Sequence, residues 1–456
     1  MPGKTATASG TSGVPVLLKA TVVAALVLPA NMVFDPLGAV GFPAMIVALL
    51  LFATWGSAIV WRAHDPTGFR HPARIGLTLF WLATVVSYLR MSNADSVQRA
   101  AADRWILSLL AMTALVLVTA ESVRTMHDAV VLARVISIAA SISAGIAIYQ
   151  FTMGTDPLDL VRSVMIGMTD NGGGTTFQAR GLLTRVAGNT FTPIELGVVT
   201  AMVLPLAVWR ALNDERGRTW IHWVQCGAIA FASVITVSRS AILGLAVAAM
   251  VTVPFLPRHA RRWAAIVIPF VVVGLFVAVP GLIATLRTTL LADSNNDPSL
   301  ATRVNNYPRV QAMIVERPWF GIGPSTYSPS NALEILDNQY LHTAVEMGMP
   351  GLLALIVLFL CPIVAALSVA LWTRDQHLKL LAAVSASGCA VAAAGSAVFD
   401  SLSFPVFIII FPIFVGLTGS VWMMARRTPD RDSAPPGPLE SRTELVTTSA
   451  LHSERG

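Results

Sequence analysis

The sequence predicts an all-α polytopic membrane protein of about twelve transmembrane helices, with one large outer-face loop that contains short helices. Composition is the first reason, since 55% of the 456 residues are hydrophobic and only 12% are charged. The mean hydropathy of +0.68 is also far above that of a soluble domain of this length. Backbone hydrogen bonds must close internally in lipid, so apolar runs of about 20 residues are expected to be helices.

The apolar runs fall into two series of similar density. The first series covers residues 15–34, 41–61, 75–89, 105–120, 129–151 and 191–208. The second covers residues 220–237, 241–255, 263–286, 349–372, 378–398 and 404–424. The first run lacks a small-residue cleavage site and is followed by further spans, so we expect a transmembrane helix and no cleaved signal peptide. Cys226, Cys361 and Cys389 all lie inside apolar runs, which predicts packing residues.

Basic residues in the connections predict the orientation. A net charge of +6 suggests nucleic-acid binding in a soluble protein, but here the cations lie between apolar runs, so a nucleic-acid partner is excluded. One set of connections carries most of them: Arg62, Arg70, Arg74, Arg124, Arg210, Arg216, Arg218, Arg258, Arg261, Arg262, Arg374, Lys379, Arg426 and Arg427. Cationic loops stay in the cytoplasm, so this side and both termini are predicted to be cytoplasmic. The connection 90–104 is the exception, because it carries three Arg on the predicted outer side.

The predicted domain organisation is a membrane domain between two disordered ends. Residues 1–14 form a disordered cytoplasmic N-terminus, residues 15–424 the membrane domain, and residues 425–456 a disordered cytoplasmic tail, since the tail lacks apolar periodicity. Two connections on the outer face are long, 152–190 and 287–348, the latter of roughly 60 residues. Loops of that length usually bind or catalyse, so function is expected there.

Short motifs follow one another through and before this larger loop. They are RVAGNTFTP at 185–193, VSRSA at 237–241, TRVNNYPR at 302–309, RPWFGIGP at 317–324, DNQYL at 337–341 and EMGMPGL at 346–352. In this order and spacing they resemble the O-antigen ligase and O-antigen polymerase superfamily. The resemblance covers residues 180–360 well, and the rest of the chain only by the number of spans.

The resemblance implies a metal-independent membrane glycosyltransferase with a GT-C-like fold in the bacterial plasma membrane. Such a protein takes a polyprenyl-diphosphate-linked oligosaccharide at the outer face and transfers it to a glycan or lipid acceptor, without a nucleotide sugar or another cofactor. Flippase and chain-length proteins are its expected partners. Polymerisation of a cell-surface polysaccharide is the preferred activity, and ligation of the glycan to an acceptor is the alternative.

Arginine side chains are the candidates for holding the diphosphate. Displacing a diphosphate builds negative charge on the leaving group, and guanidinium binds phosphate oxygens bidentately without losing its proton. Arg239 lies in a turn too short to need a charge, and it matches a family arginine implicated in diphosphate binding; the alternative is an interfacial arginine whose side chain snorkels. Arg303 and Arg309 are candidates too, with a solvated charge or a structural ion pair as alternatives. Arg185 is a weaker substrate-binding candidate.

A base must also take the proton of the acceptor hydroxyl. The ligase pattern has His directly before Asn in this stretch, whereas this chain has Asp337 before Asn338. A partly desolvated Asp can serve as base, so Asp337 is the first catalytic candidate, with helix capping as its alternative role. His342 is the second, because Glu346 at i+4 can orient it. Asn338 and Tyr340 are weak substrate-binding candidates.

Two other classes of function remain open. A transporter for a small anion such as bicarbonate needs polar groups inside several spans, and Glu195 is the clearest acid near the membrane, although it can equally orient a loop arginine. A non-catalytic assembly or flippase partner would tolerate neutral substitution of the loop arginines.

Overall fold

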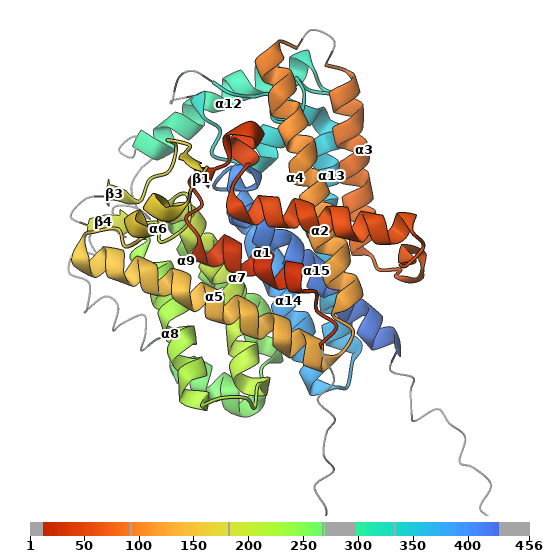
Figure 1. Ribbon diagram of the computed structural model, residues 1–456, viewed down its shortest axis with the longest axis vertical. Helices are drawn as coiled ribbons and strands as arrows, with labels where there is room; N and C mark the ends of the chain where they lie inside the picture. The colour runs from red at the N-terminus through yellow and green to blue at the C-terminus, as the bar shows by residue number, and fades with distance from the viewer. Residues whose placement is uncertain are drawn as a thin grey trace, which may run out of the picture.

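The chain folds as a bundle of apolar helices with short strands and a short helix on one side (Figure 1). The computed structural model describes residues 12–91, 94–180, 183–266, 269, 298–329, 331 and 334–427, and only the backbone of residues 180, 183 and 298–305. The predicted span 263–286 therefore lies almost entirely outside the described residues, as do most of the two predicted disordered ends and the first part of the larger outer loop.

Seven helices of the described part are long and apolar enough to cross a membrane. They are α2 (Pro43–Val60), α4 (Ser96–Ser122), α5 (Met126–Met153), α7 (Pro193–Asn213), α13 (Gln339–Trp372), α14 (Gln376–Ser396) and α15 (Phe407–Arg427). Shorter apolar helices are α1 (Val16–Val27), α3 (Ala73–Leu89), α8 (Thr219–Ile235) and α9 (Arg239–Thr252), which the 3-10 turn η3 (Val253–Phe255) extends. Each of these helices coincides with a predicted span. The chain is thus a mostly helical membrane protein, and the total of about twelve spans stays a prediction.

Helices α7, α14 and α15 form the centre of the bundle. All three are buried along most of their length, whereas only 22% of α2 is buried. A helix that is apolar on every side is expected in such a central position. Aromatic rings fill the centre, with Phe359 of α13 and Phe411 of α15 at 4.9 Å between ring centroids. Small residues allow close approach, since a side chain at Gly388 of α14 would collide with the ring of Phe414.

Hydrogen bonds place both ends of the described chain beside the α4–α5 turn. The hydroxyl of Ser12 and the amide of Gly13 donate to Asp128, and the hydroxyl of Ser420 near the end of α15 donates to the carbonyl of Val123. We call this the terminus end of the bundle. The α2–α3 connection joins it there, because Arg74 contacts Glu121 at 2.7 Å.

Helix α4 begins nine residues earlier than the span predicted at 105–120. Asp95 caps it in a capping box with Gln98, so the charged residues Arg99, Asp103 and Arg104 of the exceptional connection lie on the helix and not in a loop. The hydroxyl of Tyr88 on α3 bonds Asp103 at 2.6 Å, which fixes this helix extension against its neighbour.

The connection 152–190 contains regular structure, which corrects the purely α-helical expectation. It holds the helix α6 (Leu158–Val164), the strand β2 (Thr169–Asp170) and the antiparallel hairpin of β3 (Phe177–Arg180) and β4 (Leu183–Val186). Strand β2 pairs antiparallel with β1 (Met32–Val33), in the connection after α1 that also contains the 3-10 helix η1 (Asp35–Val40). Further 3-10 turns are η2 (Pro66–Gly68) and η5 (Ser401–Ser403). The strands and α6 gather on one side of the helical bundle (Figure 1).

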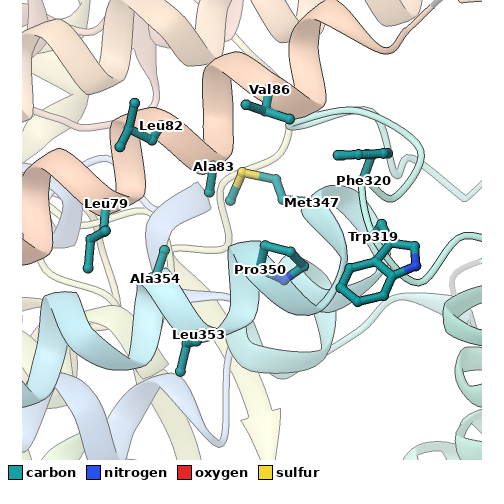
Figure 2. Close-up of a pocket in the computed structure, with 10 residues that line it drawn as sticks. All are labelled: Leu79, Leu82, Ala83, Val86, Trp319, Phe320, Met347, Pro350, Leu353 and Ala354. Atoms are coloured by element: carbon teal, nitrogen blue, oxygen red, sulfur yellow. The ribbon is translucent and has the colours of Figure 1, made fainter.

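Helix α12 (Pro298–Glu316) lies in the larger predicted loop and packs on the start of α13. Val310, Leu336 and Val345 form a small buried apolar cluster between them. The same end of α13 packs on α3, where the hydroxyl of Ser87 donates to the carbonyls of Phe320 and Glu346. Beside this contact, α3, α13 and the turn at Phe320 enclose an apolar hollow of about 320 Å³ (Figure 2).

Candidate functional site

The candidate site is built on the first turns of α13. Asn338 caps this helix, because its side-chain oxygen accepts hydrogen bonds from the amides of Tyr340 and Leu341. Its amide nitrogen donates to the carbonyl of Ala397 at 3.0 Å, which ties the cap to the end of α14. The capping role considered for Asp337 therefore belongs to its neighbour. Asp337 is half-buried directly before the cap.

A backbone break divides α13 after this short helical segment. Gly348 has φ 68° and ψ −169°, a conformation that costs an L side chain free energy. A side chain at Gly348 would also collide with the backbone of Trp319. The break lies within the EMGMPGL motif, so the segment that carries His342 precedes the apolar run 349–372.

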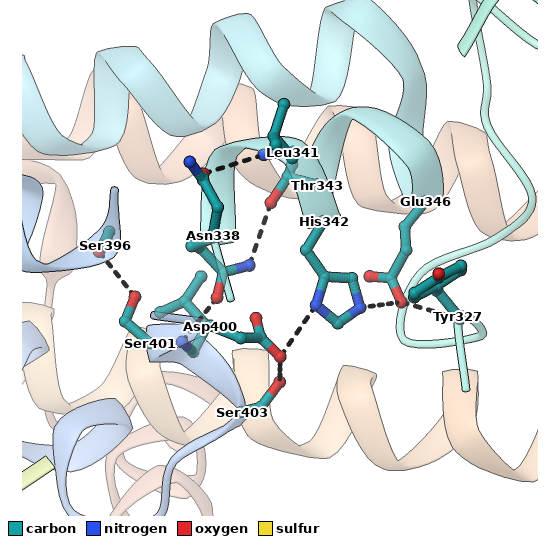
Figure 3. Close-up of polar contacts among 12 residues, drawn as sticks. Tyr327, Asn338, Leu341, His342, Thr343, Glu346, Ser396, Asp400, Ser401 and Ser403 are labelled. Carbon is teal, nitrogen blue, oxygen red and sulfur yellow. Dashed lines mark hydrogen bonds and ion pairs between the residues drawn. The ribbon is translucent and has the colours of Figure 1, made fainter. Parts of the chain in front are cut away.

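His342 lies between two carboxylates (Figure 3). Its Nε2 is 2.9 Å from Oε1 of Glu346, which confirms the predicted contact at i+4. Its Nδ1 is 2.9 Å from Oδ2 of Asp400, in the connection between α14 and α15. We call these three residues the His342 triad. All three side chains are largely buried, with 13% of His342, 9% of Glu346 and 16% of Asp400 exposed.

Neighbouring groups hold the triad in place. The amide of Tyr327 donates to Oε1 of Glu346, and the Tyr327 ring stands edge-on to the His342 imidazole at 5.7 Å. The hydroxyl of Ser403 donates to Oδ2 of Asp400 at 2.5 Å. The other oxygen of Asp400, Oδ1, is buried without a hydrogen-bond partner among the described residues.

The charges of the triad favour a protonated imidazole, because each ring nitrogen faces a carboxylate oxygen and opposite charge stabilises the charged form. The two carboxylates lie on opposite sides of the ring, so they do not converge on one point. Within the described ranges, no group of three or more His, Cys, Asp or Glu has the arrangement of a metal site.

The turn before Arg239 is strained. Val237 has φ 47°, in the left-handed region where a β-branched residue is rare. Ser238 and Ser240 then share a hydrogen bond of 2.5 Å, and Arg239 is the first residue of α9. Arg185 supports the turn from the β4 strand, since its buried guanidinium donates to the carbonyl of Thr236 at 2.7 Å. Arg185 thus holds the turn before Arg239. The substrate-binding role expected for it from the sequence stays a prediction.

Helix packing places Arg239 at the same end of the bundle as the His342 triad. Ser387 of α14 contacts Ala248 of α9, and Val391 lies beside Gly244, so the two helices run antiparallel. Continuing this register brings the beginning of α9 level with the end of α14, where Asn338 binds the carbonyl of Ala397. We call this the site end of the bundle.

Glu195 has a structural position at this end. Its Oε1 accepts hydrogen bonds from the amides of Val406 and Phe407, and its Oε2 from the amide of Phe191. These amides are the donors that the first turn of α15 and the beginning of α7 leave free. Glu195 therefore caps α15 and orients backbone, where sequence reasoning suggested a loop arginine.

The remaining predicted residues lie around the site. Arg309 of α12 pairs with Glu334 at 2.5 Å, so the structural ion pair considered as its alternative is present. Arg303 lies on α12, and its side chain is outside the described atoms. The hydroxyl of Tyr340 donates to the carbonyl of Ala393 at 2.8 Å, which ties α13 to α14.

Asp400 is the site residue that sequence reasoning missed. It lies 58 positions after His342, so no local spacing connects the two. The available signal was its place as the only acid in the short connection between two predicted spans, 378–398 and 404–424. An acid there lies at the end of two helices, where the first turns of α13 can reach it.

A bundle of helices long and apolar enough to cross a membrane, with a charged and largely buried cluster at one end, is the architecture of a polytopic membrane protein. Residues 226–356 match the family model described as O-antigen ligase. The match supports an O-antigen ligase/polymerase-like family and confirms the resemblance found in the motifs. It includes Arg239, Arg303, Arg309, Asp337 and His342, while Arg185 and Asp400 lie outside it. No curated protein matches the chain.

Proposed function

We propose that the protein is a glycosyltransferase of the bacterial plasma membrane that polymerises a cell-surface polysaccharide. Its donor is a polyprenyl-diphosphate-linked oligosaccharide presented at the outer face, made and flipped by other proteins. The observation that carries the proposal is the His342 triad, at the same end of the bundle as the Arg239 turn. An acid-base group beside a fixed cation is what transfer from a diphosphate requires.

Arg239 is the proposed diphosphate ligand. It opens α9, so its guanidinium and the free amides of the first helical turn present positive charge at one place. The strained Val237 and the buried Arg185 hold the turn in a fixed position. A preorganised cation stabilises the leaving diphosphate more than a mobile one, because it need not reorganise during the reaction. Arg303 is the proposed second ligand, and Arg309 a third.

On the acceptor side, a carboxylate takes the proton of the attacking hydroxyl. The acceptor oxygen forms a bond to the anomeric carbon, the bond from that carbon to the diphosphate oxygen breaks, and the hydroxyl proton passes to the base. Asp337 is the proposed base, from its place in the family pattern. Asp400 is a second candidate, because its Oδ1 is buried with no partner in the described part of the chain. His342 then positions Asp400 and Glu346.

Ligation of the glycan to an acceptor is the second candidate function. The family model that matches the chain is described as O-antigen ligase, which favours it. Asp337 stands where the ligase pattern has His, and this departure favours polymerisation. The product distinguishes the two activities, since a polymerase lengthens the glycan and a ligase moves a finished glycan to another lipid.

The test is glycan analysis in a deletion strain complemented with wild type, Arg239→Ala, Arg303→Ala, Asp337→Asn or Asp400→Asn, at equal membrane levels. We expect the arginine variants to accumulate short lipid-linked oligosaccharide and to lose long polymer. Whichever of the two carboxamide variants loses activity identifies the base. Unchanged glycans in the deletion strain itself would refute the glycosyltransferase, and a transport assay with bicarbonate would then test the anion transporter.

A further inference from the structure

The apolar hollow between α3 and α13 is a groove with two helical walls (Figure 2). Leu79, Leu82 and Val86 of α3 repeat at helical spacing and present one face to it. Pro350 and Leu353 of α13 form the opposite wall. At Gly76 the two helices are almost in contact, since a side chain there would lie 2.8 Å from the Cα of Leu358. The groove is therefore closed at that end and opens toward the site end.

The open end of the groove carries aromatic rings and cations. Trp319 and Phe320 line it, and both are exposed. Arg90, the residue after α3, places its guanidinium 4.9 Å from the centre of the Phe320 ring. Arg317 is exposed two residues before Trp319. Neither Arg90 nor Arg317 has an ion-pair partner among the described residues, so this mouth suits an anionic group.

The groove is attached directly to the candidate site. Met347 lines the groove, and the adjacent Glu346 belongs to the His342 triad. Ser87 of α3 holds the two together, because its hydroxyl reaches the carbonyl of Glu346 at 3.1 Å. A molecule with its apolar part in the groove therefore has its polar end close to the triad.

This geometry favours an amphiphile with one hydrocarbon chain and an anionic head. A diacyl phospholipid has a second chain, for which the groove offers no further wall. A polyisoprenyl diphosphate has one chain and an anionic head, so the cationic mouth with Arg90 and Arg317 attracts it, while Arg239 stays the proposed ligand of the diphosphate at the site end. We propose that the groove binds the first isoprene units of the lipid-linked donor, which orients the diphosphate toward the site end. This inference rests on the proposed function for the identity of the donor.

The test uses the full-length protein in nanodiscs and a photoreactive farnesyl diphosphate analogue, with the labelled peptides mapped by mass spectrometry. We expect labelling of residues 79–86 or 319–354, competed by unlabelled polyisoprenyl diphosphate and not by phosphatidylglycerol. Leu353→Trp fills the groove and should lower labelling at least about fivefold. Leu360→Trp is the matched control, since Leu360 is similarly exposed on α13 at 51% against 61% and does not line the groove.

A second variant protects the test against misfolding. Leu82→Trp fills the groove from α3, and it should reproduce the effect of Leu353→Trp at an unchanged elution volume. Equal competition by phosphatidylglycerol, or labelling of both groove variants at the wild-type level, would overturn the proposal.

The outcome is separable from that of the proposed function, because labelling requires no turnover. Specific labelling without any glycan transfer would support the groove and refute the glycosyltransferase. Normal transfer with groove variants that label like wild type would refute the groove alone. If the groove proposal and the glycosyltransferase proposal are both correct, the groove variants should raise the KM for the donor at an unchanged kcat. The reason is that they weaken donor binding away from the reacting atoms.

Discussion

Two buried polar clusters of the described part of the chain, one at each end of the bundle, differ in their balance of donors and acceptors. At the terminus end, Glu121 accepts from Trp55 at 2.9 Å, His64 at 2.7 Å and Arg74 at 2.7 Å, so one carboxylate is surrounded by donors. At the site end, one imidazole is shared by Glu346 and Asp400. The first cluster has donors in excess and the second has acceptors in excess.

Under the proposed function, this difference separates a structural cluster from a reactive one. Both oxygens of Glu121 accept hydrogen bonds, and its role is to join α2, α3 and α4. Asp400 keeps one buried oxygen without a partner in the described chain. An unpaired buried acceptor costs free energy, and such groups often serve binding or catalysis. The predictions below test this contrast.

The largest expected effect is that of Asp400→Asn on glycan transfer. The carboxamide keeps the shape of the side chain and removes the negative charge that a proton acceptor needs, so we expect activity to fall by about 100-fold or more. The measurement is the initial rate of glycan transfer by purified protein. Ser403→Ala is the control, because it removes one hydrogen bond to Asp400 and leaves the charge. Equal rates for Asp400→Asn and wild type would remove Asp400 from the reaction.

Glu121→Gln should produce the opposite pattern, with stability lost and the rate per folded molecule kept. Removing the charge leaves the partly buried Arg74 without its counter-ion, and we expect a loss of about 3 kcal/mol in the free energy of unfolding. Denaturation in detergent followed by tryptophan fluorescence measures it. Asp65→Asn is the control, as a carboxylate of the α2–α3 connection whose hydrogen bonds among the described residues go to Thr67. A rate defect in Glu121→Gln without a stability defect would contradict the structural role.

The membrane helices could be predicted because the apolar runs are local features of the sequence. The predicted start of α4 at residue 105 was wrong because Arg99, Asp103 and Arg104 interrupt the apolar pattern. The capping box of Asp95 and Gln98 marks the true start of the helix. Local spacing also predicted the pair of His342 and Glu346, which lie one helical turn apart.

Contacts between distant segments could not be predicted in this way. Asp400 reaches His342, and Glu195 reaches the beginning of α15, only because several helices end at the same level of the bundle. Their positions depend on helix packing, which hydropathy does not encode. Sequence spacing therefore predicts the pair of His342 and Glu346 on α13, and only the folded structure shows that Asp400 joins them.

The smallest predicted effect separates the cap from the proposed base at two adjacent residues. Asn338→Ala removes the cap of α13 and its bond to Ala397, which should lower the free energy of unfolding by about 1 kcal/mol. Asp337→Asn should leave stability within about 0.5 kcal/mol, since the cap stays intact. Thermal unfolding of both variants in detergent, together with transfer rates, measures the contrast. Asn338→Asp separates the two contributions, because Asp is an equally good cap residue but cannot donate to the carbonyl of Ala397. A greater stability loss for Asp337→Asn than for Asn338→Ala would give Asp337 the structural role and leave Asp400 as the candidate base.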